Sequence, residues 1–409
     1  MYDFLITGAG PAGLAAAITA AELGRSVIVI EKGKVAGPEP RGESMPQHEL
    51  FDKLIHPGFL QEISGFTSTS RRFHSSADKK NTLIKIKEPY YFFNWRDLID
   101  PLYEKAAAAG VEFIFGAEVT AVKTAASAGD DDGTATGVYY TKNGKTKELE
   151  ARAILGCGGR SCPIAAHYGI DTKAAACPTV KYRGRMNTPL PTWFTDLPGE
   201  PDLQFFAVLP NSFESVAGFP PAFAYIFPLG DSCIEAGLML RLSQFEKINN
   251  ISMPTDRQVM SAWDEAKTSL SGFADFFIDT STEYEKLTSI QNRRFIENNI
   301  MPGGGAVLIG DAVGMVDANG SAGLYYAMSQ AVGWSEMLSE AMNTNSEIWS
   351  RENCEDYLSR QSKWKFYRYI KRSFKLISFF ERIMFRTFGT DKKLNFIWPL
   401  ISAILKSAS

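Results

Sequence analysis

The chain has 409 residues, of which 45% are hydrophobic and 22% charged, as is typical of a globular protein with two domains or one domain carrying an inserted lobe. The formal net charge of −3 gives no electrostatic basis for a nucleic-acid partner. Five cysteines without a CxxC pair argue against a disulfide framework or a zinc site, and no stretch reaches the about 18 apolar residues of a spanning helix, so we expect a cytoplasmic protein without a metal.

The first predicted elements form a nucleotide-binding unit. An apolar strand over residues 2–7 runs directly into the sequence GAGPAG at residues 8–13, and an alanine-rich helix follows over residues 14–23. In such a turn the first glycine permits the tight bend, the second lets the backbone approach a pyrophosphate, and the third allows close packing of helix and strand. The start of the helix also attracts anions. The alternative interpretation is a glycine-rich turn with a structural role only.

A second predicted strand, over residues 26–30, ends at an acidic residue. A carboxylate at this point accepts hydrogen bonds from a ribose diol and disfavours a 2′-phosphate. The strand, turn, helix and acid together predict that a dinucleotide binds to Gly8, Gly10, Pro11, Ala12, Gly13, Glu31 and Lys32.

The middle of the chain predicts a second, mostly β lobe. The sequence TAASAGDDDGTAT at residues 124–136 predicts a solvated acidic loop between two hairpin strands. Alternating runs at residues 176–186, 204–209, 223–228 and 232–241 then predict an antiparallel sheet. On the third run Phe223, Tyr225 and Phe227 alternate, so they share one face. That face either contacts an apolar or planar substrate or is ordinary sheet core.

A second anion-binding turn follows a predicted strand over residues 306–309. Gly310 and Asp311 come directly after this strand, and a glycine-rich stretch containing Gly320 and Gly323 precedes a predicted helix over residues 324–338. An aspartate at a strand end can accept hydrogen bonds from ribitol hydroxyls, and N–H groups at a helix start can face a flavin carbonyl. The second turn favours FAD over NAD, which needs no such clamp.

With these two turns the chain, from Tyr2 to about Leu338, resembles the flavoprotein monooxygenase superfamily with the p-hydroxybenzoate hydroxylase fold. The resemblance implies bound FAD and an α/β fold with α+β elements. It places a discontinuous Rossmann-like FAD-binding domain at residues 1–165 and 290–345. An antiparallel-sheet substrate domain is inserted at residues 166–289, and a helical segment follows at residues 346–409.

Further motifs carry the same resemblance. The string RGES starts where the superfamily has a second flavin contact, GAEVTAV looks like the strand that meets the adenine, and GCGGRS is a variant of the motif GADGxxS. Gly158 and Trp95 stand where the superfamily usually has an aspartate and an arginine. The resemblance implies further FAD contacts by Arg41, Gly42, Arg96, Val119, Gly159, Gly310, Asp311, Gly320 and Gly323.

Two strings resemble the geranylgeranyl reductase branch, whose members reduce prenyl double bonds. They are GDAVGMVDANGSAGLYYAMSQA at residues 310–331 and PPAFAYIFP at residues 220–228, which is similar to the signature PxxYxWxFP. The resemblance implies hydride transfer from reduced flavin to an alkene and substrate contacts by Phe223, Tyr225 and Phe227, with Tyr225 as a candidate proton donor. Because no second GxGxxG is present, NADPH or another donor would reduce the flavin transiently.

Other functions remain open at this point. Arg41 replaces a cysteine typical of the reductases, and a GES turn also occurs in halogenases, in which Lys79 or Lys80 would carry the halogen. A halogenase or a monooxygenase would act on an aromatic or apolar small molecule with oxygen. A flavoprotein electron carrier to a membrane quinone and an FAD-binding scaffold without turnover are further alternatives.

The C-terminal segment is basic and aromatic. Residues 361–409 contain eleven lysines and arginines and two acidic residues, together with many aromatic residues. Such a composition is typical of helices in a bilayer interface, and it also suits a helical pair packed on the catalytic domain with its cations in solvent. We expect an apolar or prenyl-lipid substrate and a peripheral membrane contact through residues 361–409, which would place the protein at the inner face of the membrane. The oligomeric state is left open.

Overall fold

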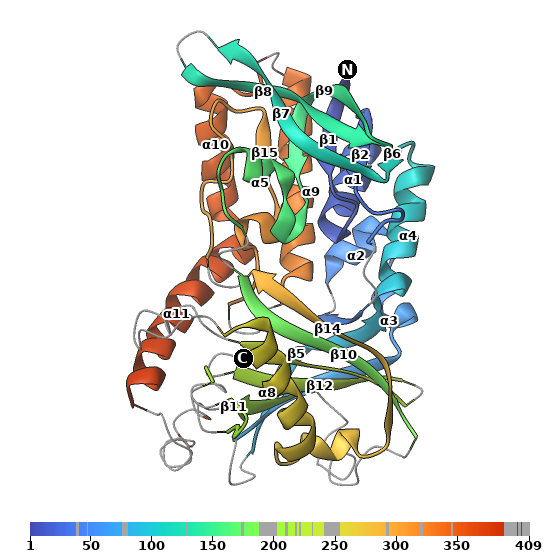
Figure 1. Cartoon of the computed structure of the whole chain (residues 1–409). Coiled ribbons are helices and arrows are strands. Elements are labelled where there is room, and N and C mark those ends of the chain that lie inside the picture. Colours follow the sequence, from blue (N-terminus) through green and yellow to red (C-terminus); the bar gives the residue numbers. More distant parts are fainter. Residues whose placement is uncertain are drawn as a thin grey trace.

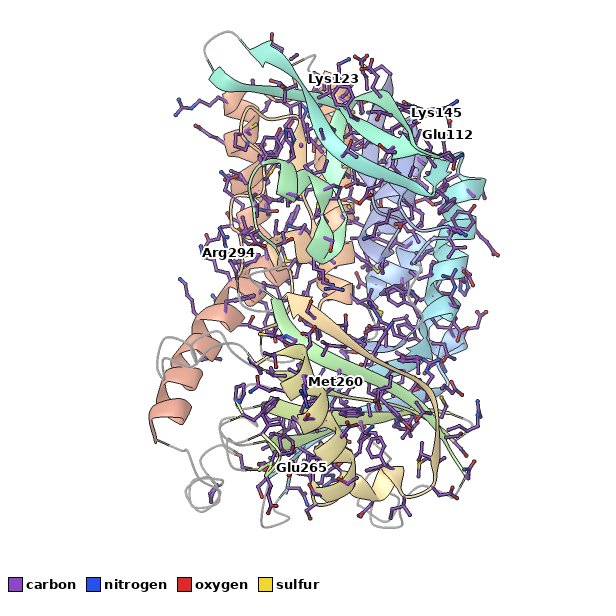
Figure 2. The ribbon with its side chains drawn as sticks, in the orientation of Figure 1. Glu112, Lys123, Lys145, Met260, Glu265 and Arg294 are labelled. Carbon is purple, nitrogen blue, oxygen red and sulfur yellow. The ribbon has the colours of Figure 1, made fainter. Side chains whose placement is uncertain are left out.

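The structure, a computed structural model, consists of two stacked domains (Figure 1). It describes residues 1–37, 41–46, 48–75, 81–127, 130–172, 176–187, 203–208, 212–216, 219–220, 222–230, 232–240, 254–291, 294–318, 322–344 and 347–387, with 399 and 402. In Figure 2, Lys123 lies on a strand at one end of the molecule, whereas Met260 and Glu265 lie on a helix at the other end.

The first domain contains a mixed sheet built from both ends of the sequence. Its strands are β1 (Tyr2–Thr7), β2 (Val27–Glu31), β6 (Glu112–Phe115), β7 (Ala117–Ser127), β8 (Asp130–Lys142), β9 (Lys145–Gly156) and β15 (Ala306–Leu308). The strand order is β6-β2-β1-β9-β8-β7, and β15 also pairs with β9. β1 pairs in parallel with β2 and β9, and β15 pairs in parallel with β9. The late strand therefore completes the sheet that the N-terminus begins.

Helices cover this sheet on both faces. The helices outside the second domain are α1 (Pro11–Glu22), α2 (Glu49–Leu54), α3 (Phe59–Ile63), α4 (Trp95–Ala108), α5 (Pro163–His167), α9 (Leu324–Thr344), α10 (Arg351–Lys363) and α11 (Lys365–Thr387). Phe4 and Ile6 of β1 pack in one buried cluster with α1, α4 and α9, whereas Leu5 packs in another with β7, β8 and α5. Burial on both faces explains the continuous apolar runs of β1 and β2.

The second domain contains an eight-stranded sheet. Its strands are β3 (Gly42–Pro46), β4 (Phe66–His74), β5 (Asn81–Asn94), β10 (Ala176–Met186), β11 (Leu203–Val208), β12 (Ala222–Gly230), β13 (Cys233–Leu240) and β14 (Thr280–Gln291). The order is β14-β10-β13-β12-β11-β4-β5-β3, and β11 and β4 form the one parallel pair among the strand pairs described. Helix α8 (Asp256–Ser269) covers one face through Val259 and Trp263.

Three strands of this sheet come from residues 42–94. The prediction that residues 1–165 belong wholly to the FAD-binding domain is therefore wrong for this part of the chain. β4 pairs with β11, and β5 pairs with both β4 and β3. β4 alternates in burial, and the backbone groups of all three strands need partners, which pairing within the second sheet supplies.

The acidic segment at residues 124–136 was predicted to be a loop, but part of it is strand. β7 and β8 extend into it, and their register includes the pair Ala125 and Thr134. Ala135 is buried, and its N–H donates a hydrogen bond to the carbonyl of Gly304. The hairpin is thus anchored to the turn before β15, although its composition is typical of a solvated loop.

The first part of the basic tail packs on the first domain. Tyr367 and Ile370 of α11 are buried and Phe374 packs beside them. The predicted helical character of the segment is confirmed over α10 and α11. Among the described residues, none of the helices is long and apolar enough to span a bilayer, and no group of His, Cys, Asp and Glu is placed to hold a metal ion.

Candidate cofactor and substrate site

A cleft of about 960 Å³ is lined by residues from both sheets. It brings together residues that are far apart in the sequence. The predicted site residues that line it are Gly8, Gly10, Pro11, Ala12, Glu31, Lys32, Arg41, Gly42, Val119, Gly159, Tyr225, Phe227, Gly310, Asp311 and Gly323.

The glycine turn between β1 and α1 leaves room at the cleft wall. Gly8 has a φ of +97°, and a Cβ atom there would lie 2.7 Å from the carbonyl oxygen of Cys157. A Cβ atom on Gly13 would lie 1.9 Å from the carbonyl oxygen of Gly8, so Gly13 lets α1 pack on the turn without lining the cleft. At Gly10 a Cβ atom would meet no protein atom within 4 Å. This open space lies at a helix start without a side-chain cap, which fits an anionic group such as a pyrophosphate.

Glu31 is held in place at the end of β2. Its side chain is buried, and its carboxylate accepts hydrogen bonds from the N–H groups of Ala9 at 2.8 Å and Gly33 at 2.6 Å. Lys32 and Val119 line the same part of the cleft. Because each carboxylate oxygen can accept more than one hydrogen bond, Glu31 can also accept from ribose hydroxyls.

The second predicted turn follows β15. Gly310 has a φ of +69°, and its N–H donates to Oε1 of Gln330 on α9 at 2.8 Å. Asp311 comes next and is exposed at the cleft. Desolvation by the surrounding protein raises the pKa of its carboxyl group, while the charge of Arg41 opposes the rise. Gly323 lines the cleft just before α9, whereas Gly320 lies outside the described residues. The turn thus brings a carboxyl group and a helix start to the cleft.

Arg96 does not line the cleft, so its predicted place there is wrong. Its guanidinium donates to the carbonyl oxygens of Ala36 at 2.7 Å and Gly37 at 3.1 Å, and it pairs with Asp100 one turn further along α4. These partners hold the side chain against the preceding loop. The neighbouring Trp95 lines the cleft instead, and the guanidinium of Arg41 lies 3.8 Å from the centre of its ring.

A partly buried pair of opposite charges links two strands of the second sheet at the cleft. Glu43 on β3 forms ion pairs with Arg41 and, at 3.3 Å, with Nζ of Lys181 on β10. Burial opposes ionisation of Glu43, but the charges of Arg41 and Lys181 outweigh it and lower the pKa of the carboxyl group. Burial also lowers the pKa of the Lys181 ammonium group. Glu43 and Lys181 both line the cleft, and neither was predicted as a site residue.

A second buried carboxyl group supports the same segment. Glu235 on β13 is 1% exposed and accepts hydrogen bonds from the N–H of Gly42 at 2.9 Å and the hydroxyl of Tyr284 at 2.7 Å. It also pairs with Arg183 at 3.3 Å. Burial raises the pKa of Glu235. The one sequence signal for this contact was a glutamate within the otherwise apolar run CIEAGLML.

The aromatic face of β12 is confirmed. Phe223, Tyr225 and Phe227 belong to one cluster, whereas Ile226 belongs to the cluster on the opposite face. Tyr225 and Phe227 line the cleft together with Phe205 of β11. Phe223 packs against Phe205, with ring centres 6.3 Å apart, and is not among the lining residues. Burial raises the pKa of the Tyr225 hydroxyl.

Cationic side chains line neighbouring strands of the same sheet. Lys181 on β10 is the register partner of Lys286 on β14, and both line the cleft. Arg160, from the turn after β9, also lines it and donates to the hydroxyl of Ser289 at 2.8 Å. The cleft therefore combines an aromatic part with a cationic part, and the sequence motifs pointed only to the aromatic part.

Comparisons with known proteins agree with this geometry. The sequence model of the family described as FAD binding domain matches residues 1–349. A digeranylgeranylglycerophospholipid reductase of Methanocaldococcus jannaschii is 24% identical over 395 residues, which cover 94% of this chain and 88% of that protein.

Solved structures share the fold. A geranylgeranyl bacteriochlorophyll reductase-like protein of Thermoplasma acidophilum gives a TM-score of 0.69 at 18% identity and covers 92% of this chain and 86% of its own. The flavin-dependent brominase Bmp2 gives a TM-score of 0.63 at 17% identity and covers 94% and 89% of the two chains. Since reductases and a halogenase share this architecture, the side chains in the cleft must distinguish their functions.

Proposed function

Since this chain belongs to the FAD binding domain family, we propose that it is an FAD-dependent reductase of carbon–carbon double bonds in a prenyl substrate with an anionic headgroup. The observation that carries the proposal is one face of the second sheet, where aromatic rings and lysines line the same cleft. The name of the archaeal relative, which refers to a geranylgeranyl lipid, supports this substrate class.

The residues of the first domain fit FAD. The open space at Gly10 accommodates a pyrophosphate, and Glu31 is fixed where a ribose diol can donate to it. Asp311 and the start of α9 provide a second set of groups for the ribitol and the flavin ring. When bound, reduced FAD supplies a hydride equivalent to the substrate.

The substrate wall is a row of register partners across the second sheet. Lys286 pairs with Lys181, Lys181 with Gly237, Gly237 with Tyr225, and Tyr225 with Phe205. A prenyl chain that lies on Phe205 and Tyr225 would exclude water from the reacting double bond, and an anionic headgroup would lie by Lys286. An amphiphilic substrate matches both parts of this row.

The test is the oxidation of the reduced holoprotein without oxygen. The FAD-loaded protein is reduced with dithionite and mixed with geranylgeranyl diphosphate in a stopped-flow instrument, while the flavin absorbance is recorded. We expect rapid reoxidation and a saturated product. Unchanged absorbance with geranylgeranyl diphosphate and with geranylgeraniol would contradict the proposal.

An oxygen-using function is the second candidate. The brominase shares the fold, and the GES turn of this chain lies in β3 at the cleft. Lys79 and Lys80, the predicted halogen carriers, lie outside the described residues. A halogenated or hydroxylated product formed from reduced protein, oxygen and bromide, with no response to prenyl compounds, would favour this function over the reductase.

We propose that NADPH or another transient donor reduces the FAD. Mixing the oxidised holoprotein with NADPH under nitrogen tests this directly, because reduction bleaches the flavin absorbance. If NADPH has no effect, a reduced electron-transfer protein becomes the expected donor.

We also propose that the chain is a cytoplasmic protein that contacts the inner face of the membrane through its basic segment. Lys365, Arg368, Arg372 and Lys375 are exposed along one side of α11, opposite its packed side. Each cation near an anionic surface contributes about 1 kcal/mol to binding. We expect sedimentation with phosphatidylglycerol vesicles, and loss of sedimentation when the four cations are replaced by glutamine. Equal sedimentation of both proteins would contradict this contact.

A further inference from the structure

We infer that Lys181 donates the proton that completes reduction of the substrate double bond, and that Glu43 holds its ammonium group in position. The inference rests on the proposed function. An alkene becomes an alkane by gaining one hydride, which reduced FAD supplies, and one proton. As the new C–H bond forms at the second carbon, an N–H bond of the Lys181 ammonium group breaks, and the neutral amine then regains a proton from solvent.

The register of the sheet places Lys181 beside the aromatic wall. Lys181 lines the cleft, and its partner across the strands is Gly237, which in turn pairs with Tyr225. A Cβ atom on Gly237 would lie 2.7 Å from the hydroxyl of Tyr225, so the phenol ring extends over the glycine. The residue between Lys181 and Tyr225 in this row is thus a glycine, whose place is taken by the ring on which the prenyl chain is proposed to lie.

Glu43 fixes the ammonium group and leaves it able to donate. Nζ of Lys181 lies 3.3 Å from Oε1 of Glu43, and the side chain of Lys181 is 14% exposed. An ammonium group has three N–H donors, and the ionised carboxylate accepts only. Glu43 also pairs with Arg41, which lines the cleft with Asp311. Through Glu43, the ammonium group of Lys181 is thus linked to Arg41, which borders the predicted flavin site.

Tyr225 is the other candidate proton donor on this wall, and it is the poorer acid. Burial raises the pKa of its hydroxyl, whereas burial lowers the pKa of the Lys181 ammonium group. A general acid works best when its pKa lies near the working pH. The charged and titratable groups around Lys181 come from several elements: Arg41 and Glu43 at β3, Glu235 on β13, Tyr284 and Lys286 on β14, Tyr225 on β12, Arg183 on β10 and Asp311 after β15.

Four variants of the FAD-loaded protein test the assignment. Lys181→Arg keeps a positive charge beside Glu43, but a guanidinium does not release its proton. Lys181→Met removes the charge, and Tyr225→Phe removes the competing hydroxyl. Lys267→Met is the matched control, because Lys267 is also paired with a glutamate, Glu285 at 2.7 Å, but does not line the cleft. Each reduced protein is mixed with geranylgeranyl diphosphate without oxygen over a range of pH.

We expect both Lys181 variants to slow reoxidation by about 100-fold or more and to lose the fall in rate at high pH, while Lys267→Met stays within a few-fold of the unchanged protein. Tyr225→Phe alters the substrate wall, so its rate is expected to fall less than that of the Lys181 variants and to keep the fall at high pH. Reoxidation by oxygen should be unchanged in all of them, which checks the flavin site. A normal rate for Lys181→Arg, or an equal loss for Tyr225→Phe, would overturn the assignment. A wild-type protein that no prenyl compound reoxidises would instead overturn the proposed function, and this inference with it.

A direct measurement of the ammonium group needs no turnover. Protein labelled with ¹⁵N at the lysine Nζ atoms gives one resonance that is absent from the Lys181→Arg spectrum. We expect this resonance to titrate below the other lysines. Titration together with the exposed lysines would contradict the role of Lys181 as an acid.

Discussion

The two walls of the cleft are made of different chemical groups. The wall from the first domain contains glycines at residues 8, 10 and 310, which leave room for a cofactor beside the two helix starts. The wall from the second domain consists of side chains that project from one sheet face. The first wall tolerates almost no added volume at these glycines, whereas the second can change its chemistry without changing the fold. We therefore expect the first wall to fix the cofactor and the second to select the substrate.

Gly13→Ala should cause the largest loss of stability and of bound FAD, because the added methyl group disrupts the packing of α1 on the glycine turn. The added Cβ atom would lie 1.9 Å from the carbonyl oxygen of Gly8, which cannot move without displacing the turn. We expect a loss of stability of about 3 kcal/mol and purification without FAD. The ratio of flavin to protein absorbance and a thermal melt check this. Full FAD occupancy with an unchanged melting temperature would show that the helix does not pack as described.

Gly10→Ala tests the position of the cofactor separately from the packing of α1. Here the added Cβ atom meets no protein atom within 4 Å, so it should clash only with a bound pyrophosphate. We expect an unchanged melting temperature for the FAD-free protein and an FAD dissociation constant raised by about 10-fold to 100-fold, which corresponds to about 1.4 to 2.8 kcal/mol. Titration of the FAD-free variant, followed by flavin fluorescence, measures this. An unchanged affinity would place the pyrophosphate elsewhere.

The sequence predicted the first wall much better than the second. Gly8, Gly10 and Glu31 were identified because their roles depend on neighbours within one strand, turn and helix. Lys181 and Glu43 were missed, because they meet only through the pairing of strands that lie far apart in the chain. Such contacts depend on register, which local patterns do not define.

Two of the incorrect predictions have the same origin, because both followed from the resemblance and not from strand pairing or side-chain contacts. Arg96 was placed at the cofactor by motif position alone, but its neighbours Ala36 and Asp100 hold it outside the cleft. Residues 42–94 were assigned to the first domain through the resemblance, although their strands pair within the second sheet.

Lys286→Met tests substrate binding by the second domain and leaves the cofactor-binding residues of the first domain unchanged. Lys286 lines the cleft next to Lys181, and its charge is proposed to attract the headgroup. We expect the half-saturating concentration of geranylgeranyl diphosphate to rise about 10-fold, while geranylgeraniol, which has no charge, is affected little. FAD content serves as the control and should not change. An equal effect on both compounds would show that Lys286 acts through packing and not through charge.

The smallest expected effects concern two carboxyl groups of the second sheet, Glu43 and Glu235, whose pKa values are shifted in opposite directions. The pKa of Glu43 is lowered, because the charges of Arg41 and Lys181 outweigh the effect of burial, so its contribution to stability is present above its unfolded pKa near 4.5 and is lost as the pH falls through its folded value. The pKa of Glu235 is raised by burial, so its contribution is greatest below the same reference value and is lost as the pH rises through its folded value. The destabilisation caused by Glu43→Gln should therefore grow with rising pH, whereas that caused by Glu235→Gln should shrink. Each unit of pKa shift corresponds to about 1.4 kcal/mol. The slope of Glu43 lies mainly below its unfolded pKa and that of Glu235 above it, so melting temperatures are measured between about pH 3 and pH 8 to resolve both. A destabilisation by Glu43→Gln that shrinks with rising pH would mean that the pKa of Glu43 is raised in the folded chain, which would contradict its ion pairs with Arg41 and Lys181.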